Sequence, residues 1–553
     1  MLRGAQALLE QGEAALAAGD WGAARAAYRD ALAVEDVPEA FFGLGTALWW
    51  LGEVTEAMPC WEAAYAGFRR RSDPVMAANV AIVISFTYSA NFGNAAVANG
   101  WSGRAARLAA AAGVAELQGW ALLAKAATCQ DPARAELQSR EALGLAAGAE
   151  GRDLELCALS SLGSALIEIG RVEEGAALLD EALAGSLGGE TESLDTVVFT
   201  SCVLVRSCYR CADFARVVEW THALEPFIAR YGNLYVNATC RTYHGAVLVA
   251  IGDWRRAEEE LQAAGELAGR ALPAVQSQVS AYLAELRLAQ GRLDEALALL
   301  AGREDQPVVI PVLAAVHLAR GEAAVAVSIA RRRLERPGSR PIEGARLREI
   351  LGEAALLEGD VDAAVGEGRA LARLGADLGC DLVAARGERL VGRALAEAGQ
   401  PGQGKRHLDH ALDGFVGLEM PWEAARTRLW LARALVVGDP AAAVAEARSA
   451  LSVFEALGAR GDRDRASAWL RRHGADAAPP QPSGLAALTK RERGVLLLVG
   501  EGLPNPEIAD RLYISRRTVE HHVASVLSKL GLRNRTEAAA FALRHVGEAR
   551  PPK

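Results

Sequence analysis

A basic segment near the C-terminus, residues 515–530, carries side chains that are suited to reading nucleic-acid bases. Arg can donate to guanine O6 and N7, Glu can accept from cytosine N4, and an Ala methyl group can contact the thymine methyl. Four residues share one exposed face of a helix predicted over residues 516–530, namely Arg517, Glu520, His521 and Ala524. We predict that these four side chains meet the base edges of DNA.

A second group of polar and basic side chains surrounds this face and is suited to phosphate oxygens. It consists of Lys490, Arg491, Ser515, Arg516, Thr518, His522, Ser525, Ser528 and Lys529. Residues 485–553 hold 12 Lys and Arg against 7 Asp and Glu, whereas the rest of the chain holds 48 against 62. The positive charge is therefore local to the C-terminus, which indicates a polyanionic partner for that part of the chain.

An apolar stripe on the same segment decides which face is free. Val519, Val523, Val526, Leu527 and Leu530 recur at the spacing of one helical face. This stripe is expected to face the core of a small domain, which leaves the base-reading group pointing outward.

Capping residues predict four helices in this part of the chain. The predicted caps are Thr489 with Glu492 in a T-x-x-E box, Asn505 before Pro506 at the first helical position, Ser515, and Asn534 with Glu537 in a second box. Gly502 is expected to end the first helix. The second and third helices are separated by a turn of about three residues, which is typical of a helix-turn-helix.

Residues 488–542 resemble the LuxR-type DNA-binding domain. The shared motifs are L-T-x-R-E, E-I-A-x-x-L, I-S-x-x-T-V-x-x-H-V and L-x-K-L-G-x-x-N-R-T-E. The resemblance implies a bacterial transcription regulator whose third helix enters the major groove of double-stranded DNA and whose fourth helix pairs two copies. It also implies RNA polymerase as a partner. We expect the pairing contact to use Ala538, Phe541, Ala542 and His545.

Two residues depart from the pattern of that family. Gly494 stands inside the first helix, at a cost of about 1 kcal/mol in helix propensity. Pro506 stands where relatives carry a polar or basic residue, so one backbone contact to phosphate is expected to be missing. Neither departure conflicts with the fold.

The preceding part of the chain is repetitive. In this protein of 553 residues, a glycine followed five positions later by Ala or Gly recurs at Gly19, Gly52, Gly170, Gly252, Gly291, Gly321, Gly359, Gly399 and Gly438. Degenerate copies stand at Gln130 and Ala212, and a further one is suspected near Gly93. Most spacings lie between 38 and 42 residues, which predicts 11 or 12 helical hairpins.

Each element of the repeat has a physical role. The glycine ends one helix in a left-handed cap, the acidic residue after it caps the next helix, and the small residue lets the two helices cross closely. The units resemble tetratricopeptide repeats with longer helices. We therefore predict an all-α chain with a solenoid over 1–474, a Pro-rich linker over 475–484 and the DNA-binding domain over 485–549. The whole resembles the C-terminal portion of large ATP-dependent LuxR-family regulators without their nucleoside-triphosphatase domain.

A solenoid of this kind presents a concave surface that can bind an effector or a partner protein. Trp21 and Trp254 share a repeat register and are predicted to be core residues. A second aromatic group does not follow that register and lines either a pocket or the core. Its members are Trp49, Trp50, Trp61, Phe86, Tyr88, Trp101 and Trp120.

Other candidate sites favour structural interpretations. The stretch GQPGQGKR, residues 399–406, matches most of a phosphate-loop pattern but falls on the repeat register and lacks the Ser or Thr that coordinates magnesium. The eight cysteines lack the second ligand pair of a metal site, and His407 and His410, which lie one helical turn apart, lack a third ligand. We predict no cofactor, no metal and no enzymatic activity.

The chain shows no signal peptide and no membrane helix, so we predict a cytoplasmic protein. The leading hypothesis is a regulator whose repeat region controls a dimeric DNA-binding domain. The alternative hypothesis is a repeat scaffold for protein contacts, in which the helix-turn-helix does not read DNA.

Overall fold

The computed structural model describes residues 2–149, 151–269, 271–335, 341–475, 488–512, 514–530 and 535–544. Within these ranges the chain forms 29 α-helices and no strand, which confirms the predicted all-α class. It divides into two compact units, Met1–Trp469 and Leu470–Lys553. The predicted linker, 475–484, lies outside the described ranges except for Ala475.

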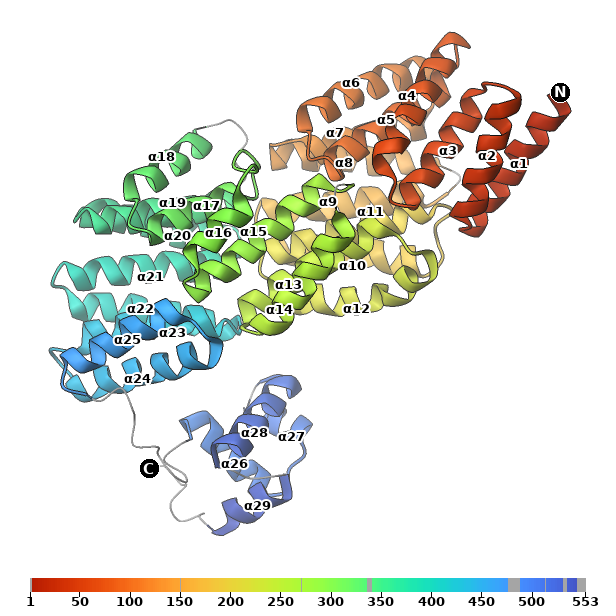
Figure 1. The fold of residues 1–553 in the computed structure, drawn as a ribbon. Helices are drawn as coiled ribbons and strands as arrows, with labels where there is room; N and C mark the ends of the chain where they lie inside the picture. The colour runs from red at the N-terminus through yellow and green to blue at the C-terminus, as the bar shows by residue number, and fades with distance from the viewer. Residues whose placement is uncertain are drawn as a thin grey trace. The chain divides into compact units, whose positions relative to one another are not determined.

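Twelve helical hairpins form the first unit (Figure 1). The first six are α1 (Leu2–Ala18) with α2 (Trp21–Val34), α3 (Pro38–Trp50) with α4 (Val54–Arg70), α5 (Pro74–Ala90) with α6 (Ala95–Ala112), α7 (Ala115–Thr128) with α8 (Pro132–Ala146), α9 (Asp153–Glu168) with α10 (Val172–Leu187), and α11 (Leu194–Arg210) with α12 (Phe214–Tyr231). The other six are α13 (Leu234–Ile251) with α14 (Trp254–Ala268), α15 (Pro273–Gln290) with α16 (Leu293–Leu300), α17 (Ile310–Ala319) with α18 (Ala323–Leu334), α19 (Pro341–Leu357) with α20 (Val361–Asp377), α21 (Asp381–Glu397) with α22 (Pro401–Gly417), and α23 (Pro421–Leu435) with α24 (Pro440–Leu457). Helix α25 (Arg460–Arg472) follows them.

The hairpin turns have the predicted geometry. Eight of the nine anchor glycines have φ between 73° and 93°, and Gly438 is the exception. Ala212 adopts the same left-handed conformation with φ 65°, so the degenerate copy of the repeat keeps the backbone shape without the glycine. The suspected turn near Gly93 is also present, between α5 and α6.

The acidic residue after the turn caps the next helix only when it is an aspartate. The capping aspartates are Asp20, Asp213, Asp253, Asp360 and Asp439, each of which accepts a backbone N–H of the following first turn. Glu53 and Glu322 make no such bond. The shorter side chain suits this contact, as it does at N-caps in general.

The small residue five positions after the turn lies where the two helices cross. Ala24, Ala57 and Ala257 are fully buried at this position. A methyl group on Gly175 would lie 2.5 Å from the carbonyl oxygen of Gly163 on the facing helix. These hairpins therefore leave no room for a larger side chain, as the spacing predicts.

The hairpin turns also contact segments about five hairpins further along the chain. A methyl group on Gly170 would lie 2.5 Å from the carbonyl oxygen of Asp377, and Trp21 Nε1 donates to the carbonyl oxygen of Tyr231 at 2.9 Å. The backbone N–H of Ala274 donates to Asn91 O at 3.0 Å. The array is thus coiled, with successive turns of the coil packed on each other.

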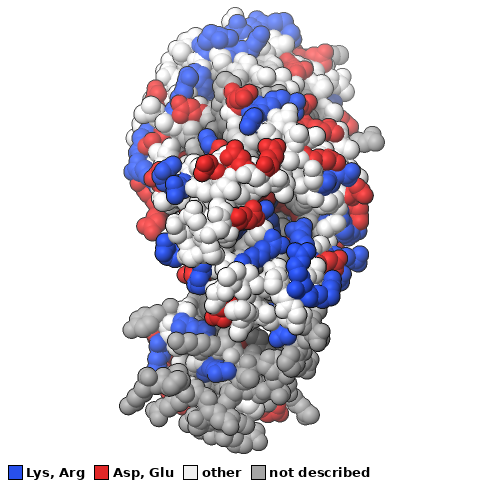
Figure 2. Space-filling model, turned by 90° about the vertical axis from the view of Figure 1, so that its left-hand side faces the viewer, with Lys and Arg blue, Asp and Glu red and all other residues white. Residues whose placement is uncertain are grey.

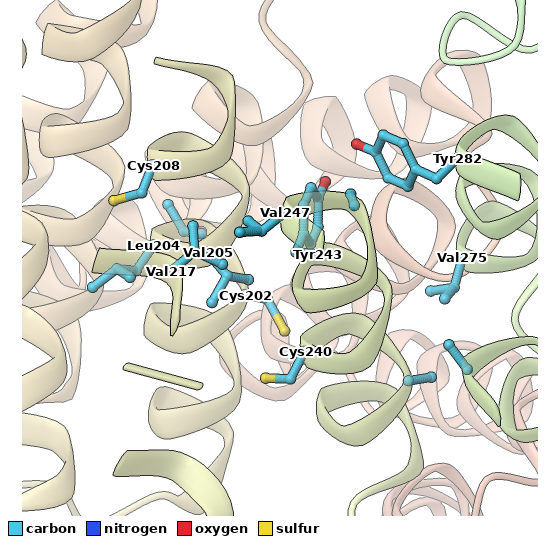
Figure 3. Close-up of a cluster of buried hydrophobic side chains, with 14 of the residues drawn as sticks. Cys202, Leu204, Val205, Cys208, Val217, Cys240, Tyr243, Val247, Val275 and Tyr282 are labelled. Atoms are coloured by element: carbon cyan, nitrogen blue, oxygen red, sulfur yellow. The ribbon is translucent and has the colours of Figure 1, made fainter. Parts of the chain in front are cut away.

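Buried side chains from consecutive hairpins form the largest core cluster. Figure 3 shows Cys202 of α11, Cys240 and Tyr243 of α13 and Tyr282 of α15 within this cluster. Burial raises the pKa of the Cys202 thiol to about 12, so the thiol stays protonated at neutral pH. Six of the eight cysteines are buried and all are free, in agreement with the predicted structural role.

Charged side chains of both signs are interspersed on the face of the array seen in Figure 2. Some charges are buried instead. Arg389 lies between Glu423 Oε2, at 2.5 Å from its Nη1, and Glu349 Oε1, at 2.9 Å from its Nη2. All three side chains are almost fully buried, so the arginine links α21 to two other hairpins through desolvated ion pairs.

Candidate nucleic-acid interface

The second unit contains a small helical module. Its helices are α26 (Lys490–Gly500), α27 (Asn505–Leu512), α28 (Arg516–Leu530) and α29 (Arg535–Arg544), as the capping residues predict to within a residue or two. Val519 and Val526 of α28 are buried, and Val523, Leu527 and Leu530 pack against the same core. The predicted apolar stripe is confirmed, and it fixes the orientation of α28 about its own axis.

Ser515 starts α28. Its Oγ accepts the backbone N–H of Thr518 at 3.1 Å, which is the predicted N-cap bond. The hydroxyl of Thr518 lies 2.7 Å from the same oxygen. Both hydroxyl groups, predicted to contact phosphate, therefore lie together at the positive end of the helix dipole, where an anion is favoured.

The first helix holds α28 through a buried glutamate. Glu492 Oε2 accepts the backbone N–H of Thr489 at 2.8 Å, and Thr489 Oγ1 accepts the N–H of Glu492, so the predicted capping box is present. The second carboxylate oxygen accepts the hydroxyl of Ser525 at 2.7 Å. The prediction that Ser525 contacts phosphate is corrected here, because its only hydroxyl hydrogen is used within the module.

A second set of hydrogen bonds, made by Arg535, joins α29 to the start of α27. Arg535 Nη1 donates to Asn505 Oδ1 at 2.6 Å, and its Nη2 donates to the carbonyl oxygen of Leu503. Asn505 is the first residue of α27, whose first backbone bond runs from Ile508 N to Pro504 O. The helix therefore begins one residue earlier than predicted, since the carbonyl oxygen of Pro504, not that of Asn505, accepts its first backbone bond.

The outer face of α28 presents part of the predicted base-reading group. Glu520 and Ala524 are exposed one helical turn apart. Arg516 Nε lies 3.1 Å from Glu520 Oε1, and both side chains are largely exposed, so this pair is weak and can exchange partners. The side chains of Arg517 and His521 lie outside the described part of the structure.

The predicted phosphate group is placed in part. Arg516 and Ser515 are exposed at the start of α28, and His522 is half-buried on its flank. Arg491 is exposed and donates through Nη2 to the carbonyl oxygen of Leu512, at the end of α27. The side chains of Lys490, Ser528 and Lys529 are not among those that the structure describes.

The predicted pairing surface on α29 requires a correction. Ala538 and Ala542 are almost fully buried in the core of the module, where α29 packs on α26. Phe541 is half-buried against the same core, and His545 lies beyond the described residues. Ala538 and Ala542 therefore hold α29 in place and are not available to a second copy.

The other candidate sites have structural roles. In the stretch 399–406, Gly399 forms a hairpin turn, helix α22 begins at Pro401, and Lys405 Nζ pairs with Asp409 at 2.5 Å. This confirms the predicted turn between helices. His407 Nδ1 lies 2.6 Å from a carboxylate oxygen of Glu388. Among the described residues no group of three or more metal-ligating side chains is present, and no helix there is long and apolar enough to cross a membrane.

Comparison with known proteins gives a specific match for the second unit. Residues 486–542 match the model of the "Bacterial regulatory proteins, luxR family". The module is a luxR-family helix-turn-helix domain. This luxR-family domain is 48% identical over 65 residues to the "Transcriptional regulatory protein LnrK" of Bacillus subtilis, and 46% identical over 68 residues to the "DNA-binding transcriptional activator DevR/DosR" of Mycobacterium tuberculosis.

The shared region is a minor part of each protein. It covers 12% of this chain in both cases, and 30% and 31% of the two relatives. The array has distant structural likenesses, which include the "APC/C hetero-tetramer Cut9-Hcn1" and a "Rap Protein Complexed with Competence and Sporulation Factor". The first has a TM-score of 0.43 at 14% identity, and the match covers 84% of this chain and 96% of the other chain. The second has a TM-score of 0.36 at 11% identity, and the match covers 66% of this chain and 98% of the other chain.

Proposed function

We propose that this chain is a bacterial transcription regulator that binds operator DNA through its luxR-family domain. The observation that carries the proposal is the orientation of α28. Val519 and Val526 lock one face into the core, and Glu520 and Ala524 are exposed outside that face, within the first nine residues of the helix. A helix that is held in this way can enter the major groove with its N-terminal half toward the bases.

The remaining parts of the proposal concern the whole chain. The array would sense an effector or a protein partner and control the domain, and the protein would act in the cytoplasm together with RNA polymerase and without catalysis. Two copies would bind half-sites about one DNA turn apart. Because Ala538 and Ala542 are buried, this pairing would have to use other residues.

The test is selection of preferred sequences from random double-stranded DNA by the full chain and by its Glu520→Ala variant. Loss of an acceptor for cytosine N4 should reduce discrimination at one base pair by about 1–3 kcal/mol. The matched control is Glu501→Ala, which removes an exposed carboxylate beyond the end of α26 and should leave the preference unchanged.

Two results would contradict the proposal. If Glu520→Ala selects the same sequence with the same stringency, the assignment of Glu520 to base reading is wrong. If the full chain retains no sequence selectively, the helix-turn-helix does not read DNA, and the protein is a repeat scaffold for protein contacts.

A further inference from the structure

The coiled array contains a partly open cavity of about 680 Å³. Most of its wall comes from the first helices of the first seven hairpins, α1, α3, α5, α7, α9, α11 and α13. Along α11, for example, Phe199, Cys202 and Arg206 face it. The volume is within the range of sites for small organic molecules, and the wall is mainly apolar.

Aromatic rings form much of this wall. Four of the seven aromatic residues that were predicted to line a pocket or the core do line it, namely Trp49, Trp61, Phe86 and Trp120. The other three lie elsewhere, as Trp50 does when it stacks on Trp21 with 4.3 Å between ring centroids. Phe199 and Tyr235 also line the cavity, although no sequence pattern singles them out.

A buried amide in the wall has a free donor. Asn91 is 1% exposed, and Trp49 Nε1 donates to its Oδ1 at 3.4 Å. An indole nitrogen can only donate, so the amide oxygen must face Trp49 and the amide nitrogen must point elsewhere. Asn91 Nδ2 is buried without a hydrogen-bond partner, and such a group favours a ligand that accepts a hydrogen bond.

Arg206 supplies a second free donor and a positive charge. Its Nε is buried without a hydrogen-bond partner, and within the described part of the chain the guanidinium makes no ion pair. One helical turn later Arg210 pairs with both Glu168 and Glu343, at 2.9 and 2.7 Å. Arg206 is thus a cation on the cavity wall whose charge the array leaves unpaired.

The two donors line the same cavity, together with aromatic side chains. Trp49 contacts Asn91 and lies 6.4 Å from Tyr235 between ring centroids. Burial raises the pKa of the Tyr235 hydroxyl, and the nearby charge of Arg206 opposes this rise. Asn91, Trp49, Tyr235 and Arg206 all line this cavity.

Most acidic groups on the wall already have partners. Glu39 pairs with Arg71 at 2.8 Å, and Glu168 pairs with Arg210. Asp195 accepts the indole N–H of Trp50 at 3.0 Å. Glu13 is exposed on α1. The wall therefore offers unused donors to a ligand, beside aromatic rings.

We propose that this cavity binds a small organic anion with an aromatic or apolar body. The anionic oxygens of the ligand pair with the Arg206 guanidinium and accept a hydrogen bond from the Asn91 amide nitrogen. The body of the ligand packs against Trp49, Phe86 and Tyr235. This inference adds a class of ligand to the proposed sensing role of the array. Its biological significance depends on that proposed role. The binding measurement uses no DNA, so its failure would leave the DNA-binding proposal standing.

The test uses two fluorescent probes on the full chain. 8-Anilinonaphthalene-1-sulfonate carries a negative charge, and N-phenyl-1-naphthylamine has the same rings without it. We expect the charged probe to bind at one saturable site. Its affinity should fall at least about tenfold in Arg206→Gln and be partly restored in Arg206→Lys. The neutral probe should bind both variants equally, which shows that the cavity is intact.

The control variant is Arg69→Gln, which removes an exposed arginine from the end of α4 and should change neither affinity. Asn91→Leu should weaken the charged probe severalfold. The proposal is overturned if the charged probe shows no saturable site, if it binds Arg206→Gln as tightly as the unmodified chain, or if the two probes lose affinity in parallel.

Discussion

The repeat array and the luxR-family domain place their charges differently. In the array, Arg389 is almost fully buried between Glu349 and Glu423. In the domain, the pair formed by Arg516 and Glu520 lies at the surface, with side chains 71% and 49% exposed. A desolvated pair is lost only at a high cost, whereas a solvated pair is exchanged freely. The array thus uses this arginine to hold its shape, and the domain keeps the Arg516–Glu520 pair accessible to a partner.

The largest effect is expected from breaking the buried pair. Arg389→Met removes the cation and keeps an apolar chain against Phe415, whose ring centroid lies 4.7 Å from the guanidinium carbon. Two buried carboxylates then lose one partner each, although Glu349 keeps Arg346 and Glu423 keeps Arg426. The free energy of unfolding should fall by at most about 3–5 kcal/mol, the cost of leaving a buried charge unpaired. Urea denaturation of the full chain, followed by far-ultraviolet circular dichroism, measures this change.

Arg255→Met is the matched control, because Arg255 is 79% exposed and pairs with Glu259 at the surface. It should change the free energy of unfolding by less than about 1 kcal/mol. Equal effects of the two substitutions would show that burial does not distinguish these ion pairs.

The two regions share one packing device, a small residue where helices cross. In the array, Gly175 meets the backbone of Gly163, and in the domain a methyl group on Gly500 would lie 2.7 Å from Ala542 Cβ. Gly500→Ala should therefore displace α29 and destabilise the domain by about 1–3 kcal/mol. The urea midpoint of the domain's transition measures the effect, and an unchanged midpoint would mean that α29 tolerates the extra carbon.

The smallest expected effect is an increase in the stability of the domain. Gly494 lies inside the same helix α26, and a methyl group there would meet nothing within 4 Å. Gly494→Ala should stabilise the domain by about 1 kcal/mol, because alanine favours the helix more than glycine. The same denaturation experiment applies, and a loss of stability would reveal a contact at this position that the structure does not contain.

Local patterns explain what the sequence could predict. The hairpin turns, the cap at Ser515 and the valine stripe of α28 depend on residues within a few positions of each other, where spacing determines contact. The burial of Ala538 and Ala542 depends on which side of α29 meets α26. Because α29 carries alanine on several sides, its own sequence does not show this.

Contacts between distant segments account for the other differences. The bond from Ser525 to Glu492 and the bond from Arg535 to Asn505 join residues about thirty positions apart, so no spacing rule could indicate them. The cavity depends on the coiling of seven hairpins. An arginine without a partner, such as Arg206, is indistinguishable in the sequence from the paired Arg210 one turn later.

The contacts between hairpin turns and segments about five hairpins away have an evolutionary consequence. In an open array, a hairpin can be duplicated or deleted while its neighbours keep their interfaces. Here, one hairpin added between residues 170 and 231 would move Gly170 away from Asp377 and Trp21 away from Tyr231 together. The number of repeats is therefore fixed by the packing of the coil on itself, and changes in length are expected to be tolerated only at its two ends.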